Sequence, residues 1–195
     1  SKDDISFYPI IYWAITDKTN ILSNTIINKI QIYMKNGGLI VFDTRDLSPT
    51  NIISKINSKE QENLKIILKA LDLPVLIKVP NNHVIRRAFY LLDELPGRFT
   101  GGDVWVEATA KNSRDGVSSV LIGGNDWASA WAKGPNSKPI YLVIPGGEKQ
   151  REFSYRFGIN LVMYSMTGNY KADQVHIKSI LKRLNTKSNK EEIIE

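Results

Sequence analysis

The sequence predicts an α/β fold, in which a mostly parallel sheet lies between helices as a three-layer sandwich. Segments with the composition of buried strands alternate at least four times with segments of helical spacing, and this alternation indicates βαβ units. The strand-like runs are almost continuously apolar, as in sheets that are covered on both faces. With 195 residues the chain suits a single domain, which we expect over 1–186, followed by a charged, disordered tail over 187–195.

Capping and turn residues set the boundaries of these elements. Ser23 and Ser58 are expected helix N-caps, the second in a capping box with Gln61, while Gly37 and Pro74 end the two helices. The expected strands cover 7–13, 39–43, 75–79, 104–108, 118–124 and 140–144. Further helices are expected around Trp127 and Trp131, over 148–166 and, with an amphipathic pattern, over 175–184. Apolar and polar residues alternate over 104–108, which predicts a half-exposed strand, antiparallel and at an edge.

Composition excludes several classes of function. Cysteine is absent, which removes disulfides, thiolate nucleophiles and cysteine metal sites. No spacing typical of metal ligands occurs either, so we expect neither a metal nor a cofactor. The net charge of +6 and the pI near 9.4 would suit a nucleic-acid binder, but the basic residues are dispersed and part of the excess lies on the last helix and the tail. We therefore expect a solvated basic surface and no nucleic-acid partner. The chain has no apolar run long enough to span a bilayer, and no signal peptide opens it.

The stretch SSVLIGGNDWASAW, residues 118–131, is the most informative local pattern. An apolar run reaches Gly123 and Gly124, and Asn125 and Asp126 then open a short helix that carries Trp127. A strand that feeds a helix through glycines delivers backbone N–H groups and polar side chains to one edge of a sheet. Since α/β proteins bind ligands at such corners, we expect a site here.

Other polar side chains are expected at or near this edge. Asp43, Arg45 and Asp46 follow the strand 39–43 and would meet Asn125 and Asp126 at the carboxyl ends of the strands. His83 lies in a loop where a general base could stand, and Arg156 lies early in the long helix, where it could orient an anionic or hydroxylated ligand. Each candidate also has a structural explanation. Asn125 or Asp126 would cap the helix, and Arg45 would pair with Asp46 or Asp126 between loops. His83 would anchor its loop, Arg156 would be solvated or ion-paired, and Trp127 would pack in the core.

Five separated segments carry a family resemblance. They read FYPIIYW, NGGLIVFDTRD, HVIRRAFYLL, GGNDWASAW and YRFGINLVMYSMTGNYKADQVH. In this order, and over nearly the whole chain, they resemble a bacterial family catalogued as domain of unknown function 4159. The resemblance implies a class I glutamine amidotransferase-like, flavodoxin-like fold, with trehalose-utilisation-type proteins as distant relatives. Class I amidotransferases need a cysteine that a histidine activates, so a chain without cysteine is not a thiol amidotransferase.

The resemblance also implies a cellular context. Related family members look like large proteins anchored in the bacterial inner membrane and similar to aerotolerance-operon proteins, with further chain ahead of the strand 7–13. By this resemblance the chain is the soluble C-terminal region of an envelope protein, favouring the periplasmic side. Because the sequence opens almost directly into a core-type strand, we also expect that the domain lacks a preceding βα unit. Their genes commonly neighbour a MoxR-type AAA+ ATPase, so such an ATPase or a von Willebrand-type protein is the expected partner.

Two hypotheses about function follow. In the first, the domain is a binding or scaffolding module that contacts a partner loop or a polar small molecule at the expected edge of the sheet. In the second, it is a hydrolase of a carbohydrate or related envelope substrate, with Asp126 or Asp43 as base and His83 as acid. The second hypothesis requires the imidazole and a carboxylate to face each other across one cleft.

Overall fold

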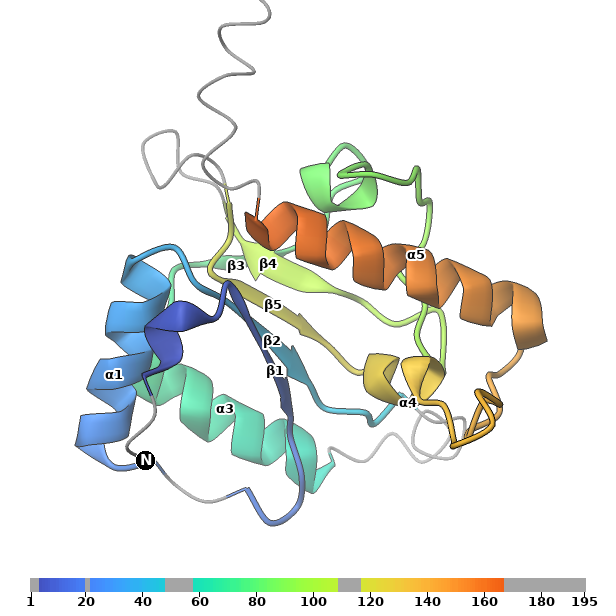
Figure 1. Cartoon of the computed structure of the whole chain (residues 1–195). Coiled ribbons are helices and arrows are strands. Elements are labelled where there is room, and N and C mark those ends of the chain that lie inside the picture. The colour runs from blue at the N-terminus through green and yellow to red at the C-terminus, as the bar shows by residue number, and fades with distance from the viewer. Residues whose placement is uncertain (1–3, 20–21, 48–57, 109–116, 167–195) are drawn as a thin grey trace, which may run out of the picture.

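The computed structural model describes residues 4–19, 22–47, 58–108 and 117–166, and within them the strands form one open, mixed sheet (Figure 1). The strands are β1 (Ile10–Ala14), β2 (Leu39–Asp43), β3 (Leu76–Lys78), β4 (Trp105–Glu107) and β5 (Val120–Gly123), in the spatial order β1-β2-β5-β4-β3. β1, β2 and β5 are parallel, whereas β4 is antiparallel to both of its neighbours. The predicted α/β class and the antiparallel direction of β4 are confirmed. The predicted edge position of β4 is wrong, because β3 lies outside it.

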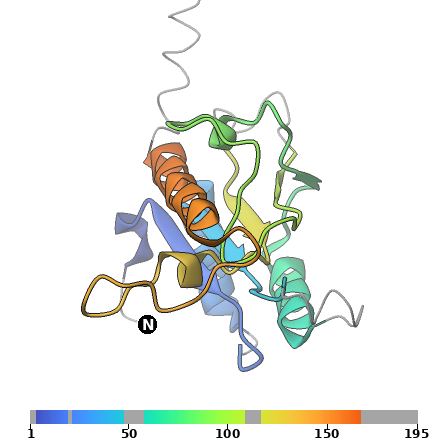
Figure 2. The ribbon, with the colours of Figure 1, turned by 90° about the vertical axis from the view of Figure 1, so that its right-hand side faces the viewer.

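Helices cover both faces of the sheet. α1 (Asn24–Lys35) and α3 (Lys59–Leu71) lie on one face, and α5 (Gly147–Met166) crosses the other, with the short α4 (Trp127–Trp131) beside its first turns (Figures 1 and 2). Two 3-10 turns, η1 (Ile5–Phe7) and η2 (Val84–Arg86), complete the described elements. Within the described chain, no helix has the length and apolar character needed to cross a membrane.

The central strands contribute alternate residues to two separate cores. Successive side chains of a strand point to opposite faces of the sheet, and helices cover both faces here. The core under α5 contains Leu39, Val41, Val106 and Leu121 with Trp127, Phe157, Leu161 and Tyr164. The core under α1 and α3 contains Ile40, Phe42, Val120 and Ile122 with Ile30, Tyr33, Met34, Leu64, Ile67 and Leu71. β2 and β5 are therefore buried on both faces, as their unbroken apolar runs predict.

Local signals explain most of the boundaries. Ser58 is the N-cap of α3, and its hydroxyl accepts from the Gln61 amide at 3.1 Å, as the capping pattern predicts. The helix ends where Asp72 takes a left-handed conformation, two residues before Pro74. Ser23 precedes α1 without a side-chain cap bond.

Two strand predictions need correction. The strand expected over 7–13 begins only at Ile10, because Asp4 caps the preceding 3-10 turn by accepting from the Ser6 amide. The segment 140–144 is not a strand. Its carbonyls at Tyr141 and Leu142 accept from the guanidinium groups of Arg151 and Arg98, and Leu142 itself is exposed. The helix expected over 175–184 and the tail over 187–195 lie outside the described residues.

Candidate functional site

The carboxyl edge of the parallel strands gathers most of the predicted site residues. Asp43 ends β2 opposite Gly123, which ends β5, so the two polar turns that follow these strands start side by side. The residues brought together in this way are Asp43, Arg45, Asp46, Asn125, Asp126 and Trp127. Their hydrogen bonds show what each of them does there.

Asp43 is the centre of this corner. Its Oδ1 accepts from the backbone amides of Arg45 (3.0 Å) and Asp126 (3.2 Å), and its Oδ2 accepts from the Trp127 amide (2.8 Å) and from the Tyr12 hydroxyl. The side chain is completely buried. Burial raises the pKa of the Asp43 carboxyl above its ordinary value, although these hydrogen bonds act in the opposite direction. With four donors already bound, Asp43 organises the corner and is not exposed to a ligand.

Two residues bound to Asp43 have unusual backbones. Arg45 (φ 55°) and Asp126 (φ 56°) both adopt the left-handed conformation, which is uncommon outside glycine and costs free energy. Both donate their amides to the same Asp43 oxygen, so this carboxylate stabilises both turns. The Arg45 side chain also donates to the Ile15 carbonyl at 3.2 Å.

Asp46 joins the turn after β2 to the start of α3. Its Oδ1 accepts from the Thr44 hydroxyl, and its Oδ2 accepts from the Ser58 hydroxyl (3.1 Å) and from the Gln61 side-chain amide. Within the capping sequence of α3, Gln61 thus contacts Asp46 with its side chain. The position of Asp46 is explained by these contacts, and it anchors a helix.

Trp127 belongs to the core. Its ring is fully buried and contacts Phe157 with 5.2 Å between ring centroids, and its Nε1 donates to the Leu95 carbonyl at 3.1 Å. An indole in this position has no surface on which a sugar ring or a partner could stack. Core packing, the structural explanation of this tryptophan, is therefore what the structure shows.

His83 and Arg156 lie away from the corner. His83 precedes η2, where its Nδ1 accepts from the Ile85 amide, and its ring contacts Tyr164, whose hydroxyl accepts from the Ser118 amide at the amino end of β5. β5 runs from this end to Gly123, just before the turn that holds Asp126, so the contacts of His83 lie at the opposite end of β5 from that turn. Arg156 pairs with Glu152 and stacks on Tyr90 and Phe153. The carboxylate–imidazole pair that the hydrolase hypothesis requires is thus not brought together.

Two buried acceptors at the corner lack partners in the part of the chain that the structure describes. They are Asn125 Oδ1 and Asp126 Oδ1, in side chains that are 2 % and 5 % exposed. The Asn125 side chain is held by its Nδ2, which donates to the Leu95 carbonyl at 3.0 Å, and Asp126 Oδ2 lies 3.6 Å from Arg98 Nη1. A buried acceptor without a donor costs about 1–3 kcal/mol, so a ligand that supplies a donor would be favoured here.

Asn125 lines a polar cleft of about 290 Å³, which we call the Asn125 cleft. Its other lining residues come from the end of β3, from η2 and from the loop between η2 and β4, and include Lys78, Arg86, Asp93, Glu94, Thr100, Gly102 and Asp103. A Cβ on Gly102 would lie 2.9 Å from Asn125 Oδ1, so a larger residue here would push against the Asn125 side chain. Among the described residues, no cluster of three or more acidic, histidine or cysteine side chains is arranged to bind a metal ion.

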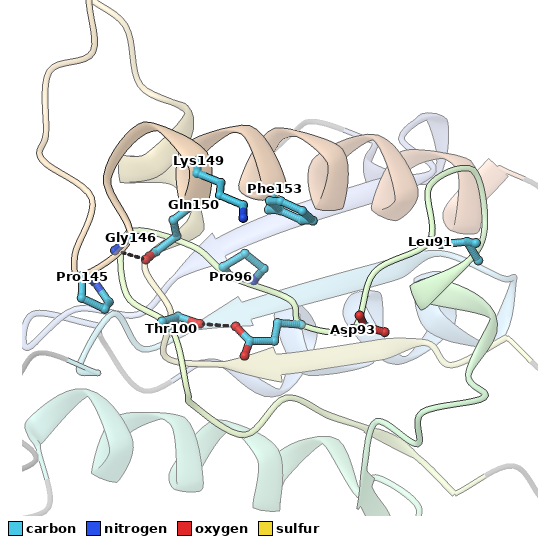
Figure 3. Close-up of a pocket in the computed structure, with 10 residues that line it drawn as sticks. Leu91, Asp93, Pro96, Thr100, Pro145, Gly146, Lys149, Gln150 and Phe153 are labelled. Atoms are coloured by element: carbon cyan, nitrogen blue, oxygen red, sulfur yellow. Dashed lines mark hydrogen bonds between the residues drawn. The ribbon is translucent and has the colours of Figure 1, made fainter.

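A second cleft of about 410 Å³ adjoins the first and shares Asp93, Glu94 and Thr100 with it. We call it the Leu91 cleft. Its apolar lining consists of Leu91, Pro96, Pro145 and Phe153, and its charged lining consists of Asp93, Glu94 and Lys149. Figure 3 shows Lys149 and Phe153 reaching down from α5 above Pro96, with Thr100 on the opposite side, where its hydroxyl donates to Glu94 at 2.9 Å. Leu91 is 84 % exposed at one end.

Two buried amides on α5 maintain this cleft, and sequence reasoning missed both. Gln150 donates to the carbonyls of Gly97 and Ile144 and accepts from the Gly146 amide, while Asn160 accepts from the Tyr90 amide at 2.7 Å and donates to the Ile85 carbonyl. A signal was present in the sequence: both occur at core-facing positions of a helix, where apolar residues are expected. Polar residues at such positions imply buried backbone groups opposite them.

Comparison with known proteins gives a family and no function. A family model described as domain of unknown function (DUF4159) matches residues 1–166, which is most of the chain. No curated protein matches the chain. The matched range ends with α5 and includes both clefts and the whole described sheet.

Proposed function

The chain belongs to the DUF4159 family, and from that premise we propose that it is a binding or scaffolding domain that holds a polypeptide segment of a protein partner in the Leu91 cleft. The observation that carries the proposal is the exposure of Leu91 beside an apolar cleft. A large apolar side chain that is 84 % exposed next to other apolar surface is typical of a protein contact.

The chemistry of the cleft supports a polypeptide ligand. Pro96, Pro145 and Phe153 offer a surface for one apolar side chain, while Asp93 and Lys149 place charges of both signs at the rim. Peptides combine these features, because an apolar anchor is flanked by backbone and charged groups. The corner at Asp43 supports a scaffold as well, since the Asp43 carboxylate is engaged with the protein itself.

The wider context is part of the same proposal. We place the domain in a protein anchored in the bacterial inner membrane and similar to aerotolerance-operon proteins. On the periplasmic side, its partner would be a von Willebrand-type protein; a MoxR-type AAA+ ATPase would require that the domain face the cytoplasm, where ATP is present. We also propose that the fold is a variant of the flavodoxin-like, class I amidotransferase-like group. Three parallel strands with helices on both faces support this relationship, and the reversed β4 is the departure from it.

A polar small molecule in the Asn125 cleft is a second candidate ligand. The specific observation in its favour is Asn125 Oδ1, a buried acceptor without a donor among the described residues. Such a ligand would carry an amino or hydroxyl group. Asn125→Ala would remove this acceptor and should abolish binding of such a ligand. Because the change also removes the Nδ2 bond to the Leu95 carbonyl, circular dichroism would check that the variant is folded.

The test of the main proposal measures, by calorimetry, binding between the purified chain and a MoxR-type ATPase. Leu91→Asp should weaken binding at least tenfold, because it puts a charge on the apolar contact. Ile32→Asp is the matched control, since Ile32 is 60 % exposed on α1, across the sheet from the cleft. Equal affinity of the two variants would refute the cleft as the binding surface. An ATPase that does not bind the wild-type chain would refute that partner.

A further inference from the structure

The connection between α4 and α5 presents a cluster of exposed apolar side chains, and in Figure 2, where it is gold and orange, it projects from the body of the molecule. We call residues 140–144 the apolar loop. Four of its five side chains are between 40 % and 79 % exposed: Ile140, Tyr141, Leu142 and Ile144. Large apolar residues at a protein surface normally occur singly, so a run of this kind indicates a contact with another apolar medium.

The backbone of the apolar loop is held in place although its side chains are exposed. The Tyr141 carbonyl accepts from Arg151 Nη2 at 2.6 Å, and the Leu142 carbonyl accepts from Arg98 Nε at 3.2 Å. The Ile144 amide donates to the Arg98 carbonyl at 2.8 Å. Backbone groups that already have partners lose little when the water around them is removed. These parts of the loop can therefore enter an apolar medium while their hydrogen bonds persist.

Positive charge accompanies the apolar loop. Residues 127–147 contain Lys133 and Lys138, both exposed, and they contain no acidic residue. Glu148, the first acidic residue after them, pairs with Arg151 at 3.2 Å. An exposed apolar segment with lysines and without carboxylates beside it complements a surface that is both apolar and anionic, and a bilayer with anionic lipids combines these two properties.

We propose that the apolar loop inserts into the headgroup region of a bilayer that carries anionic lipids. Ile140 and Leu142 reach the boundary with the acyl chains, and Tyr141 stays among the headgroups, where amphipathic aromatic rings are favoured. A fluid bilayer adapts to a projecting loop, whereas a protein partner needs a hollow of matching shape. Two copies of the chain that met here would bring their lysines together, which is unfavourable. The inference depends neither on the Leu91 cleft nor on a membrane anchor elsewhere in the protein.

Co-flotation of the full chain with lipid vesicles measures this binding. Vesicles of equal parts phosphatidylcholine and phosphatidylglycerol should bind the chain at least tenfold more strongly than vesicles of phosphatidylcholine alone. Leu142→Asp places a charge on the most exposed side chain of the loop and should weaken binding to the anionic vesicles at least tenfold. Ile32→Asp, on the exposed side of α1 across the sheet, is the matched control and should bind as the wild type does. Circular dichroism checks that both variants are folded.

A fluorescent dye that senses polarity reports where the chain meets the vesicle, and the absence of cysteine permits labelling at one introduced site. On Ile140→Cys its emission should move to shorter wavelength with anionic vesicles, whereas on Ile32→Cys it should not. Three results would overturn the proposal: no binding of the wild-type chain to anionic vesicles, equal binding of Leu142→Asp and wild type, or the same emission shift at both labelled positions. Loss of a lipid-free dimer in Leu142→Asp, with vesicle binding unchanged, would instead assign the loop to a contact between copies.

Discussion

Replacing Asp43 with alanine removes the single acceptor that satisfies four donors at the corner between β2 and α4. Three of the donors are backbone amides, those of Arg45, Asp126 and Trp127, and the fourth is the Tyr12 hydroxyl. Alanine offers these donors no acceptor, and the space that it leaves is too small and too apolar for water to supply one. We therefore expect a large loss of stability, well above the effect of removing an exposed carboxylate.

The magnitude follows from the burial of the donors. The amides of Asp126 and Trp127 form buried hydrogen bonds, and an unpaired buried donor costs about 1–3 kcal/mol, so these two alone contribute about 4 kcal/mol. The Arg45 amide is partly buried and adds a smaller amount. A loss of this size is a large part of the roughly 5–15 kcal/mol that stabilises a typical domain.

Urea denaturation at pH 7, followed by tryptophan fluorescence, measures the change in the free energy of unfolding. Asp17→Ala, on an exposed loop, is the matched control and should change it by less than about 0.5 kcal/mol. Asp43→Asn keeps one acceptor oxygen and should lie between alanine and wild type. If Asp43→Ala costs less than about 1 kcal/mol, the corner is not organised by this carboxylate and our account of it is wrong.

Three further predictions concern the same framework. Burial raises the pKa of Asp43, so the folded state binds the carboxyl proton more tightly than the unfolded chain does. The stability that this proton contributes is fully present below the ordinary pKa of about 3.9 and is lost as pH rises through the raised pKa. Asp43→Asn should remove this part of the pH dependence of the urea midpoint. Asn160→Ala should lower the free energy of unfolding by about 2–4 kcal/mol and speed amide hydrogen exchange at Tyr90, whereas unchanged exchange there would contradict the anchoring role. Gly97→Ala should prevent or severely weaken folding, since its Cβ would lie 2.3 Å from the Asn125 carbonyl oxygen; a thermal midpoint within a few degrees of wild type would refute this close approach.

The parts of the fold that sequence predicted correctly are those whose signal is local. β2 is an apolar run bounded by a glycine pair and polar residues, and α3 carries its own cap at Ser58. The error at 140–144 has a long-range cause: the run is apolar, but the carbonyl groups of Tyr141 and Leu142 contact two arginines from elsewhere in the chain. Composition alone does not reveal such partners, so a strand was expected.

The candidate site divides in the same way. Topology brings the ends of β2 and β5 together, so the meeting of Asp43 with Asp126 could be predicted from two polar turns after two core strands. The hydrogen bond that Asp43 accepts from the Trp127 amide, 84 residues away in the sequence, could not be predicted. The clefts could not be predicted either, because residues 91–104 carry no periodic pattern, and the loop is held by Gln150 at Gly97 and by Asn160 at Tyr90.

The polar corner and the clefts are parts of one construction. The Leu95 carbonyl accepts from both Asn125 Nδ2 and Trp127 Nε1, and the Asn125 carbonyl accepts from the Phe99 amide, so the loop that lines both clefts is fastened directly to the corner. Asp43 in turn fixes the backbone of Trp127. The residues that the sequence pattern predicts as a ligand site thus support the site indirectly. They position a neighbouring loop that lines the clefts and whose own sequence carries no distinctive pattern. In the DUF4159 family, variation in the binding surface is therefore expected in the loop, while the corner that supports it is constrained by the fold.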